Sequence, residues 1–290
     1  MKQKYLEIIK DSIKSYWLFL LPHHLISRIT YIITRTEHPL TPFLIKTYIN
    51  FFKVNIKECE TTDIKKYKTF CDFFTRKLRK GIHKIDKTSN SIVSSCDGKI
   101  LEYGVIKNDS IVQVKGKTIK INELFDNDKN YEDIYNNGSF ITIYLSPKDY
   151  HRVHMPCTGK LLKTIHVPGR LYSVAKHAVN IINKLYSRNE RLICSFKEKE
   201  VNFSVVFVAA INVSSIEVVW KGEASPPCPK KTVRTSYEKK KVILLKGNEL
   251  GMFKSGSTVI LLFDSKVALS SSIKKGKNIR VGNKIGRITN

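Results

Sequence analysis

The chain has 290 residues, enough for one large domain with a full hydrophobic core, or for one domain with an extension. Its 51 basic and 25 acidic residues give a formal net charge of +26, which predicts attraction to nucleic acid or to an anionic membrane surface. Because the chain is rich in Lys, Ile and Asn together, genome-wide base composition is an equal explanation of that charge. No window reaches the roughly 20 predominantly apolar residues that a membrane-spanning helix needs, so we expect a soluble or peripheral protein.

Residues 1 to about 55 have the pattern of basic amphipathic helices. Apolar residues recur at helical spacing over 5–20, 25–34 and 43–52, with Lys and Arg between them, and Pro22 separates the first two segments. Aromatic residues such as Tyr16 and Trp17 on the apolar side are typical of segments that lie in a membrane interface. The alternative is that these helices cap the rest of the chain.

From about residue 90 the pattern changes to strands. The turn signal Asn136-Asn137-Gly138 precedes an alternating segment, and one helix is predicted at 173–185. We therefore predict an α+β fold, with a mainly β-sandwich-like catalytic domain over 56–290 and a helical, membrane-associating extension over 1–55. The predicted strands are 139–145, 205–210, 216–220, 242–245, 259–263 and 285–288.

The six cysteines form no C-x-x-C pair and are scattered along the chain. This predicts reduced thiols in a cytosolic compartment and no metal site. They are Cys59, Cys71, Cys96, Cys157, Cys194 and Cys228.

Three separated segments supply an acid, a base and a hydroxyl. Asp97 precedes Gly98, His154 lies in the run Tyr150-His151-Arg152-Val153-His154-Met155-Pro156, and Ser257 follows Gly256 at the start of an apolar run. The order Asp…His…Ser occurs in hydrolase triads, but no Gly-x-Ser-x-Gly elbow surrounds Ser257. A Gly-Ser bond at a strand entrance is instead well placed for the serine to attack its own preceding carbonyl. Without further context, Asp97 would be a turn aspartate and Ser257 a strand residue.

These segments resemble those of the bacterial phosphatidylserine decarboxylases, pyruvoyl enzymes that process themselves. The resemblance extends over nearly the whole chain, and the Tyr150-to-Pro156 run is its most specific part. One residue departs from the family pattern: Ser255 stands where a Leu usually precedes Gly-Ser-Thr. The other matching segments are 70–79, Asp97-Gly98, 149–159, Val167-Pro168-Gly169, Arg188-Asn189-Glu190-Arg191 and 246–263.

The resemblance implies that the chain cuts itself between Gly256 and Ser257. Ser257 attacks the Gly256 carbonyl, His154 acts as the base and Asp97 orients it; matching to the family favours His154 over His151 for this role. The products are a β chain, 1–256, and an α chain, 257–290, whose first residue becomes the pyruvoyl group. The two chains stay together as a heterodimer, and pairing of two heterodimers is left open.

The resemblance also implies the reaction of the mature enzyme. Phosphatidylserine forms a Schiff base with the pyruvoyl group derived from Ser257, loses carbon dioxide and leaves as phosphatidylethanolamine, in the pathway of phospholipid biosynthesis. His151 would bind the substrate phosphate or assist proton transfer. Arg76 and Arg152 are candidate anion contacts, with solvated surface charge as the alternative. No metal, nucleotide or pyridoxal phosphate is required, and we expect a peripheral protein on the cytoplasmic face of the cell membrane.

Two other functions compete with this one. A serine hydrolase would use Asp97, His154 and Ser257 on an external acyl substrate and would stay a single chain. A nucleic-acid-binding β protein would account for the net charge, but the sequence has neither the aromatic-plus-basic RNP signature nor zinc-finger spacing, so no nucleic-acid partner is expected.

Overall fold

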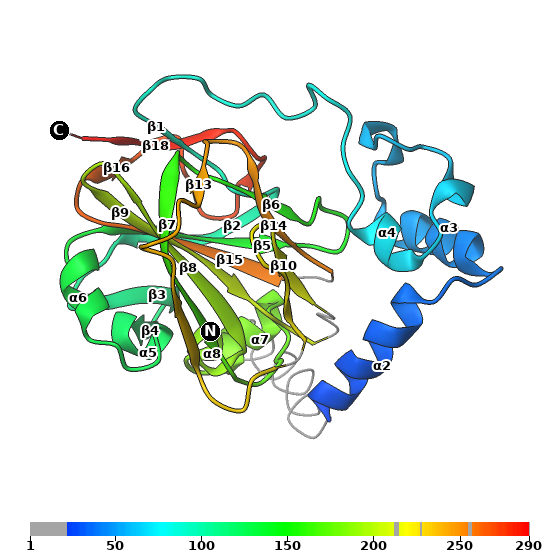
Figure 1. Ribbon diagram of the computed structural model, residues 1–290, viewed down its shortest axis with the longest axis horizontal. Coiled ribbons are helices and arrows are strands. Elements are labelled where there is room, and N and C mark those ends of the chain that lie inside the picture. Colours follow the sequence, from blue (N-terminus) through cyan, green and yellow to red (C-terminus); the bar gives the residue numbers. More distant parts are fainter. Residues whose placement is uncertain (1–21, 212–214, 227, 255–256, 290) are drawn as a thin grey trace, which may run out of the picture.

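The computed structural model describes residues 22–211, 215–226, 228–254 and 257–289. Helices α2 (His23–Arg35), α3 (Thr41–Phe52) and α4 (Phe70–Phe74) lie together on one side of a larger β body (Figure 1). The first two confirm the helices predicted at 25–34 and 43–52, whereas the one predicted at 5–20 lies outside the described residues. Among the described helices, none is long and apolar enough to cross a membrane.

Local sequence explains where two of these helices begin and end. Pro42 stands in the first turn of α3, where its missing N–H costs no hydrogen bond, and Lys53 ends the helix in a left-handed conformation with φ 58°. A capping box starts α4, because the Thr69 hydroxyl accepts from the Asp72 N–H while the Asp72 carboxylate accepts from the Thr69 N–H.

A nine-stranded antiparallel sheet forms the centre of the β body (Figure 1). Its order is β12-β7-β8-β9-β15-β5-β2-β17, with β13 also paired to β7. The strands are β2 (Gly98–Val105), β5 (Ser139–Leu145), β7 (Gly159–Val167), β8 (Arg191–Glu198), β9 (Val201–Val208), β12 (Val233–Ser236), β13 (Ile243–Leu244), β15 (Ser257–Phe263) and β17 (Asn278–Ile279).

Three smaller antiparallel sheets complete the β structure, in the orders β1-β18-β16, β11-β10-β14-β6 and β3-β4. Their strands are β1 (Ser91–Val93), β3 (Ser110–Val114), β4 (Lys117–Lys120), β6 (Arg152–His154), β10 (Ile216–Val218), β11 (Gly222–Ser225), β14 (Glu249–Phe253), β16 (Val267–Leu269) and β18 (Lys284–Ile288). The remaining helices are short: η1 (Ile56–Glu58), η2 (Ile64–Lys66), α5 (Ile121–Leu124), α6 (Asn130–Tyr135), α7 (Lys176–Ile181) and α8 (Leu185–Arg188).

Strand β15 lies inside the nine-stranded sheet, and every one of its residues is buried. It pairs with β5 on one side and β9 on the other, and its burial explains the unbroken apolar run of its sequence. The register sets Ser257 opposite Leu145, and Thr258 opposite Val208. The first residue of this fully buried strand is therefore the residue that the sequence predicts to be reactive.

The α+β prediction is confirmed as a fold of mostly antiparallel sheets with few helices. The helix predicted at 173–185 is wrong in extent, because α7 covers only Lys176–Ile181 and Lys184 then adopts a left-handed conformation with φ 53° before α8. The boundary between residues 55 and 56, and the membrane role of the extension, stay predictions.

Candidate active site

Ser257 is the first described residue after the predicted cleavage point; Gly256 and Ser255 lie outside the described residues. Its side chain is fully buried, and its Oγ has no hydrogen-bond partner within the described part of the chain. A buried hydroxyl without a partner forfeits a hydrogen bond that it would make in water. A buried hydroxyl without a hydrogen bond does not stabilise the fold, so Ser257 is a candidate for a reactive residue.

His151 lies directly before β6, which pairs with β14, the last strand before the predicted cleavage point. Its backbone carbonyl accepts from the Phe253 N–H at 3.0 Å, so β14 runs past His151 toward residue 255. Its Nδ1 lies 2.9 Å from the Asp149 carbonyl oxygen, which can only accept, so Nδ1 carries the proton and Nε2 keeps a lone pair. Nε2 is buried without a hydrogen-bond partner among the described residues.

The environment of His151 keeps its ring neutral. It is fully buried, with its ring 4.1 Å from that of Phe74. Burial, together with the positive charge of Arg76, lowers the pKa of His151 from 6.5 to about 3. At neutral pH, His151 therefore presents Nε2 as an unprotonated base.

His154 is also oriented by a backbone carbonyl. Its Nδ1 donates to the Gly247 oxygen at 2.8 Å, and its Nε2 accepts from the Tyr150 hydroxyl at 3.1 Å. Burial is the main cause that lowers the pKa of His154, so this ring also favours its neutral form.

Asp97 makes different contacts from those that the sequence leads us to expect. Its Oδ1 accepts from His83 Nε2 and from the Val281 N–H, both at 2.8 Å. The His83 ring lies 5.2 Å from that of Tyr150 and 6.4 Å from that of His154. The structure therefore brings Asp97 and His154 into one neighbourhood, but among the described contacts there is no hydrogen bond between them.

Two members of this neighbourhood, His83 and Tyr150, were not predicted as site residues. Tyr150 belongs to the specific run that contains both histidines, so a signal for it was present. His83 lies between α4 and β1, in none of the segments that matched the family, and only the fold brings it to Asp97.

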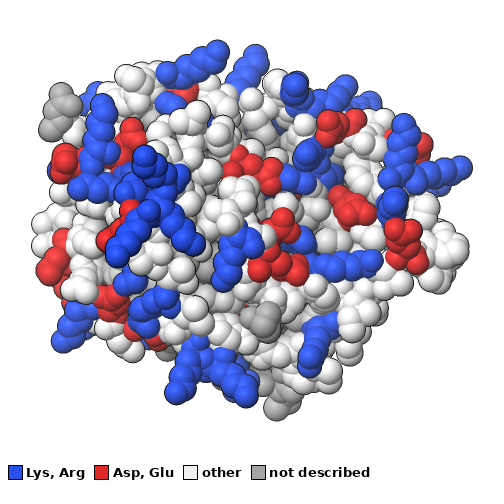
Figure 2. All heavy atoms as spheres, in the orientation of Figure 1, with Lys and Arg blue, Asp and Glu red and all other residues white. Residues whose placement is uncertain are grey.

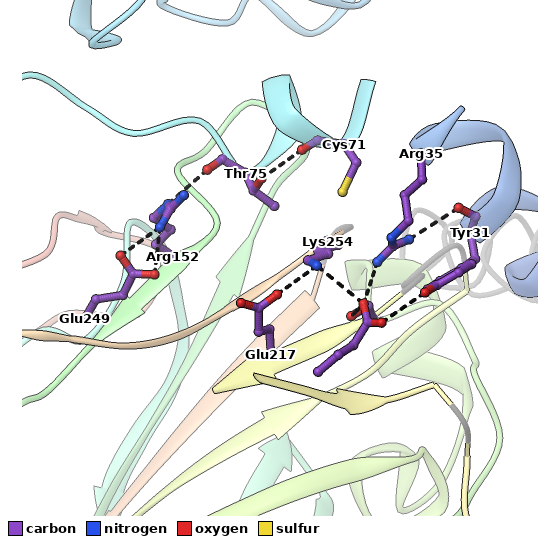
Figure 3. A network of polar contacts seen from close by, with 10 residues as sticks. Tyr31, Arg35, Cys71, Thr75, Arg152, Glu217, Glu249 and Lys254 are labelled. Carbon is purple, nitrogen blue, oxygen red and sulfur yellow. Dashed lines mark hydrogen bonds and ion pairs between the residues drawn. The ribbon is translucent and has the colours of Figure 1, made fainter. Parts of the chain in front are cut away.

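The two arginines that were candidate anion contacts bind protein groups instead. Arg76 is only 4% exposed, and its Nη2 donates to the carbonyl oxygens of Lys148 and Asp149, which fixes the turn before His151. Arg152 binds both carboxylate oxygens of Glu249, at 2.7 and 2.8 Å (Figure 3). Neither is a solvated surface charge.

Two clefts flank this region. One, of about 600 Å³, is bordered by Asp97 and Tyr150 and has a basic lining of Lys53, Arg76, Lys99, Lys148 and Arg280. The other, of about 370 Å³, lies between the N-terminal helices and the sheet and includes Lys254. Its aromatic lining consists of Tyr48, Phe52, Phe70, Phe74 and Tyr144.

A network of ion pairs connects helix α2 to the chain just before the cleavage point. Lys254 Nζ lies 2.8 Å from a Glu217 carboxylate oxygen and 3.4 Å from one of Glu223. Glu223 also accepts from Arg35 at 2.7 Å and from the Tyr31 hydroxyl at 3.0 Å (Figure 3). Because Lys254 is two residues from Gly256, this network holds one end of the predicted cleavage segment.

Comparison with known proteins identifies the family. The family model described as phosphatidylserine decarboxylase matches residues 70–287. The chain belongs to the phosphatidylserine decarboxylase family. It is 42% identical over 275 residues to the phosphatidylserine decarboxylase proenzyme of Alkalilimnicola ehrlichii, covering 93% of this chain and 96% of that one. The proenzymes of Alcanivorax borkumensis (39% identical, 94% of each chain) and Francisella philomiragia (38% identical, 97% of this chain and 99% of that one) are similar over comparable lengths.

Membership of the phosphatidylserine decarboxylase family makes the chain an enzyme, a carboxy-lyase, and the relatives' names describe precursors that are processed. The residues around Ser257 fit a small covalent group made in place. The Ser257 hydroxyl is enclosed and unpaired within the described residues, and Nε2 of His151, which lies just before β6, is equally unpaired there. The predicted roles of Asp97, His154, Ser257 and His151 stay predictions at this point.

Proposed function

We propose that this protein converts phosphatidylserine to phosphatidylethanolamine, with a pyruvoyl group made at Ser257 by self-cleavage after Gly256. The observation that carries the proposal is the buried, unpartnered Ser257 hydroxyl at the entrance of the central strand in a member of this family. A serine hydrolase with the same three residues would stay a single chain with an unmodified Ser257, so the intact mass of the protein distinguishes the two functions.

Self-cleavage begins when Ser257 Oγ attacks the Gly256 carbonyl carbon. The new C–O bond replaces the C–N bond and gives an ester. Loss of the Ser257 α-proton with breakage of its Cβ–O bond then releases the Gly256 carboxylate and leaves dehydroalanine. Tautomerisation and hydrolysis expel ammonia and give the pyruvoyl group. His154 is proposed as the base, because its Nδ1–H is held by the Gly247 carbonyl and its Nε2 carries the lone pair.

Asp97 is proposed to support His154 through the neighbours that separate them. His83 contacts the Asp97 carboxylate, Tyr150 contacts His154, and the His83 and Tyr150 rings lie 5.2 Å apart. A positioned base contributes typically about 10²- to 10⁴-fold to a proton-transfer step. The proposed role of the Asp97 carboxylate is therefore an indirect one, through His83 and Tyr150, rather than that of a hydrogen-bond partner of His154.

The pyruvoyl group supplies an electron sink for the pair that remains on the substrate when carbon dioxide leaves. The chain's own residues bind and position the substrate and move protons. His151 Nε2 is a neutral acceptor for a substrate proton, and its lowered pKa means that it gives the proton up readily. The aromatic cleft beside Lys254 suits the apolar part of a lipid.

A lipid substrate requires the protein to meet the bilayer, and α2 and α3 offer a surface for this. Their outward residues are large and apolar, and a patch of that kind marks an interaction surface. Lys and Arg are spread over the visible face with fewer Asp and Glu among them (Figure 2), in keeping with the net charge of +26 and an anionic membrane. We therefore propose peripheral binding at the cytoplasmic face of the cell membrane. The exposed residues are Leu25, Ile29, Ile32, Ile33, Phe43, Leu44 and Phe51.

The α chain, 257–290, would remain bound after cleavage. It contains β15, which pairs with β5 and β9 of the β chain, and β18, which pairs with β1. Separating the two chains would unpair the central strand, so a stable β–α heterodimer is the expected product.

Intact mass spectrometry of the purified protein tests the proposal. Two chains, 1–256 and 257–290, are expected, the smaller one blocked to Edman degradation. Reduction with cyanoborohydride in the presence of phosphatidylserine should attach the lipid to the smaller chain. An active preparation with an intact chain and unmodified Ser257 would refute self-processing, and release of no carbon dioxide from carboxyl-labelled substrate would refute the decarboxylase.

A further inference from the structure

A second cluster of reactive side chains includes none of the residues proposed for self-cleavage. A ring nitrogen of His24, a carboxylate oxygen of Glu190 and Sγ of Cys228 all lie within 4.8 Å of one another. They come from the first turn of α2, from the residue before β8 and from the loop after β11. Residues that are more than 35 positions apart in the sequence therefore meet at one point where α2 contacts the β body.

Glu190 is the buried member of the cluster and is ionised. It is 2% exposed, and its Oε1 accepts from His166 Nε2 at 2.8 Å and from the Ser225 hydroxyl at 2.6 Å. Burial raises the pKa of Glu190, but the hydrogen bonds from His166 and Ser225 outweigh it, and the net shift is downward. The cluster therefore contains one carboxylate, that of Glu190, whose negative charge is stabilised by two hydrogen bonds.

His24 is the exposed member. Its Nε2 lies 3.1 Å from the Gly169 carbonyl oxygen, to which it donates, so Nδ1 keeps the lone pair. Histidines that bind metals usually donate their other ring N–H to a carbonyl or carboxylate, which fixes the tautomer. The hydrogen bond to Gly169 leaves His24 Nδ1 with the lone pair that a metal ligand needs.

Cys228 is half-buried beside Glu190, and this position is unfavourable for a thiolate on its own. Burial, and then the charge of Glu190, raise the pKa of the Cys228 thiol to about 12. A divalent cation between the two groups would balance two negative charges, one from the thiolate and one from the carboxylate, with the thiol proton released to solvent.

We propose that His24, Glu190 and Cys228 form a binding site for one divalent transition-metal ion, with zinc as the ion that this donor set fits best. Imidazole nitrogen, carboxylate oxygen and thiolate sulfur are the ligands of zinc, with bonds of about 2.0 to 2.3 Å that set tetrahedral donors roughly 3.5 Å apart. The three donor atoms now lie within 4.8 Å of one another, so the side chains would have to close around the ion. Water takes the fourth position, and His166 supports Glu190 from behind. The ion would fasten the start of α2 to the β body.

Metal binding to the full-length protein, prepared without a histidine tag, tests this site. After equilibrium dialysis against zinc chloride, one zinc ion per chain is expected. Titration with cobalt(II) should give a thiolate-to-cobalt absorption band. Cys228→Ser should abolish the band, and His24→Ala should raise the cobalt Kd by more than tenfold. His166→Gln, which removes only an outer partner, should raise it by roughly 10- to 100-fold.

Two matched variants serve as controls: exposed His38→Ala, and Cys71→Ser, which removes a thiol from α4. Both should bind cobalt like the unaltered protein, and so should Ser257→Ala, because the site does not depend on self-cleavage. Circular dichroism checks that each variant is folded. If Cys228→Ser does not fold, His24→Ala still tests the site, because His24 is exposed. The proposal is overturned if the unaltered protein binds no stoichiometric metal, or if Cys228→Ser keeps the same Kd and spectrum.

Discussion

Replacement of His151 should make the protein less sensitive to acid. In the unfolded chain this imidazole titrates near 6.5, whereas burial lowers its pKa in the folded protein to about 3. Below pH 6.5 the unfolded state therefore binds a proton that the folded state does not, and stability falls as the pH falls. In the variant His151→Asn, the amide nitrogen can take the place of Nδ1 opposite the Asp149 carbonyl, but the side chain does not titrate.

The size of the effect follows from the two pKa values. One pH unit of differential protonation corresponds to about 1.4 kcal/mol. Protonation of His151 in the unfolded chain should therefore lower the free energy of unfolding by about 2 kcal/mol between pH 7 and pH 5. Over this range the folded-state ring stays neutral, so the loss depends on the unfolded pKa and hardly on the folded one. The pKa of His154 is lowered as well, but that residue is present in both proteins and cancels in the comparison.

Urea denaturation at pH 7 and pH 5 measures the difference. The comparison is made in a Ser257→Ala background, in which the chain is expected to stay whole. His151→Asn should lose about 2 kcal/mol less than its parent over this interval, whereas His38→Asn, at an exposed position, should lose as much as the parent. Equal losses in His151→Asn and its parent would show that His151 is protonated in the folded state, and the argument for a neutral base would fail.

Three further predictions concern processing, the ion-pair network and membrane binding. Ser257→Ala should leave one intact chain by mass spectrometry; a cleaved variant would exclude Ser257 as the nucleophile. Glu223→Gln weakens the contacts to both Arg35 and Lys254, so it should lower the free energy of unfolding, measured in urea, by about 1–3 kcal/mol. It should also slow the appearance of the two chains, and an unchanged rate would show that the ion-pair network does not affect self-cleavage. Ile29→Asp with Ile33→Asp should reduce sedimentation with anionic liposomes while cleavage continues, and undiminished binding would assign the membrane surface elsewhere.

The sequence alone determined the features that depend on neighbours along the chain. Alternation and unbroken apolar runs predicted the strands at 139–145 and 259–263, because a buried strand must fill its faces with apolar side chains whatever its partners are. Helical spacing predicted α2 and α3 in the same way. The position of Ser257 at a strand entrance, after a glycine, was also legible from local sequence.

Only the tertiary structure decided which groups face one another. Asp97 binds His83 and the Val281 N–H, and His154 binds the Gly247 carbonyl, because hydrogen-bond partners are chosen by proximity in space, and none of these pairs is close in sequence. The helix predicted at 173–185 failed for a related reason: a left-handed Lys184 turns the chain there, although the local pattern is apolar enough for a helix. The cluster of His24, Glu190 and Cys228 has no spacing signature at all, since three distant segments each contribute one side chain, and folding alone brings them together.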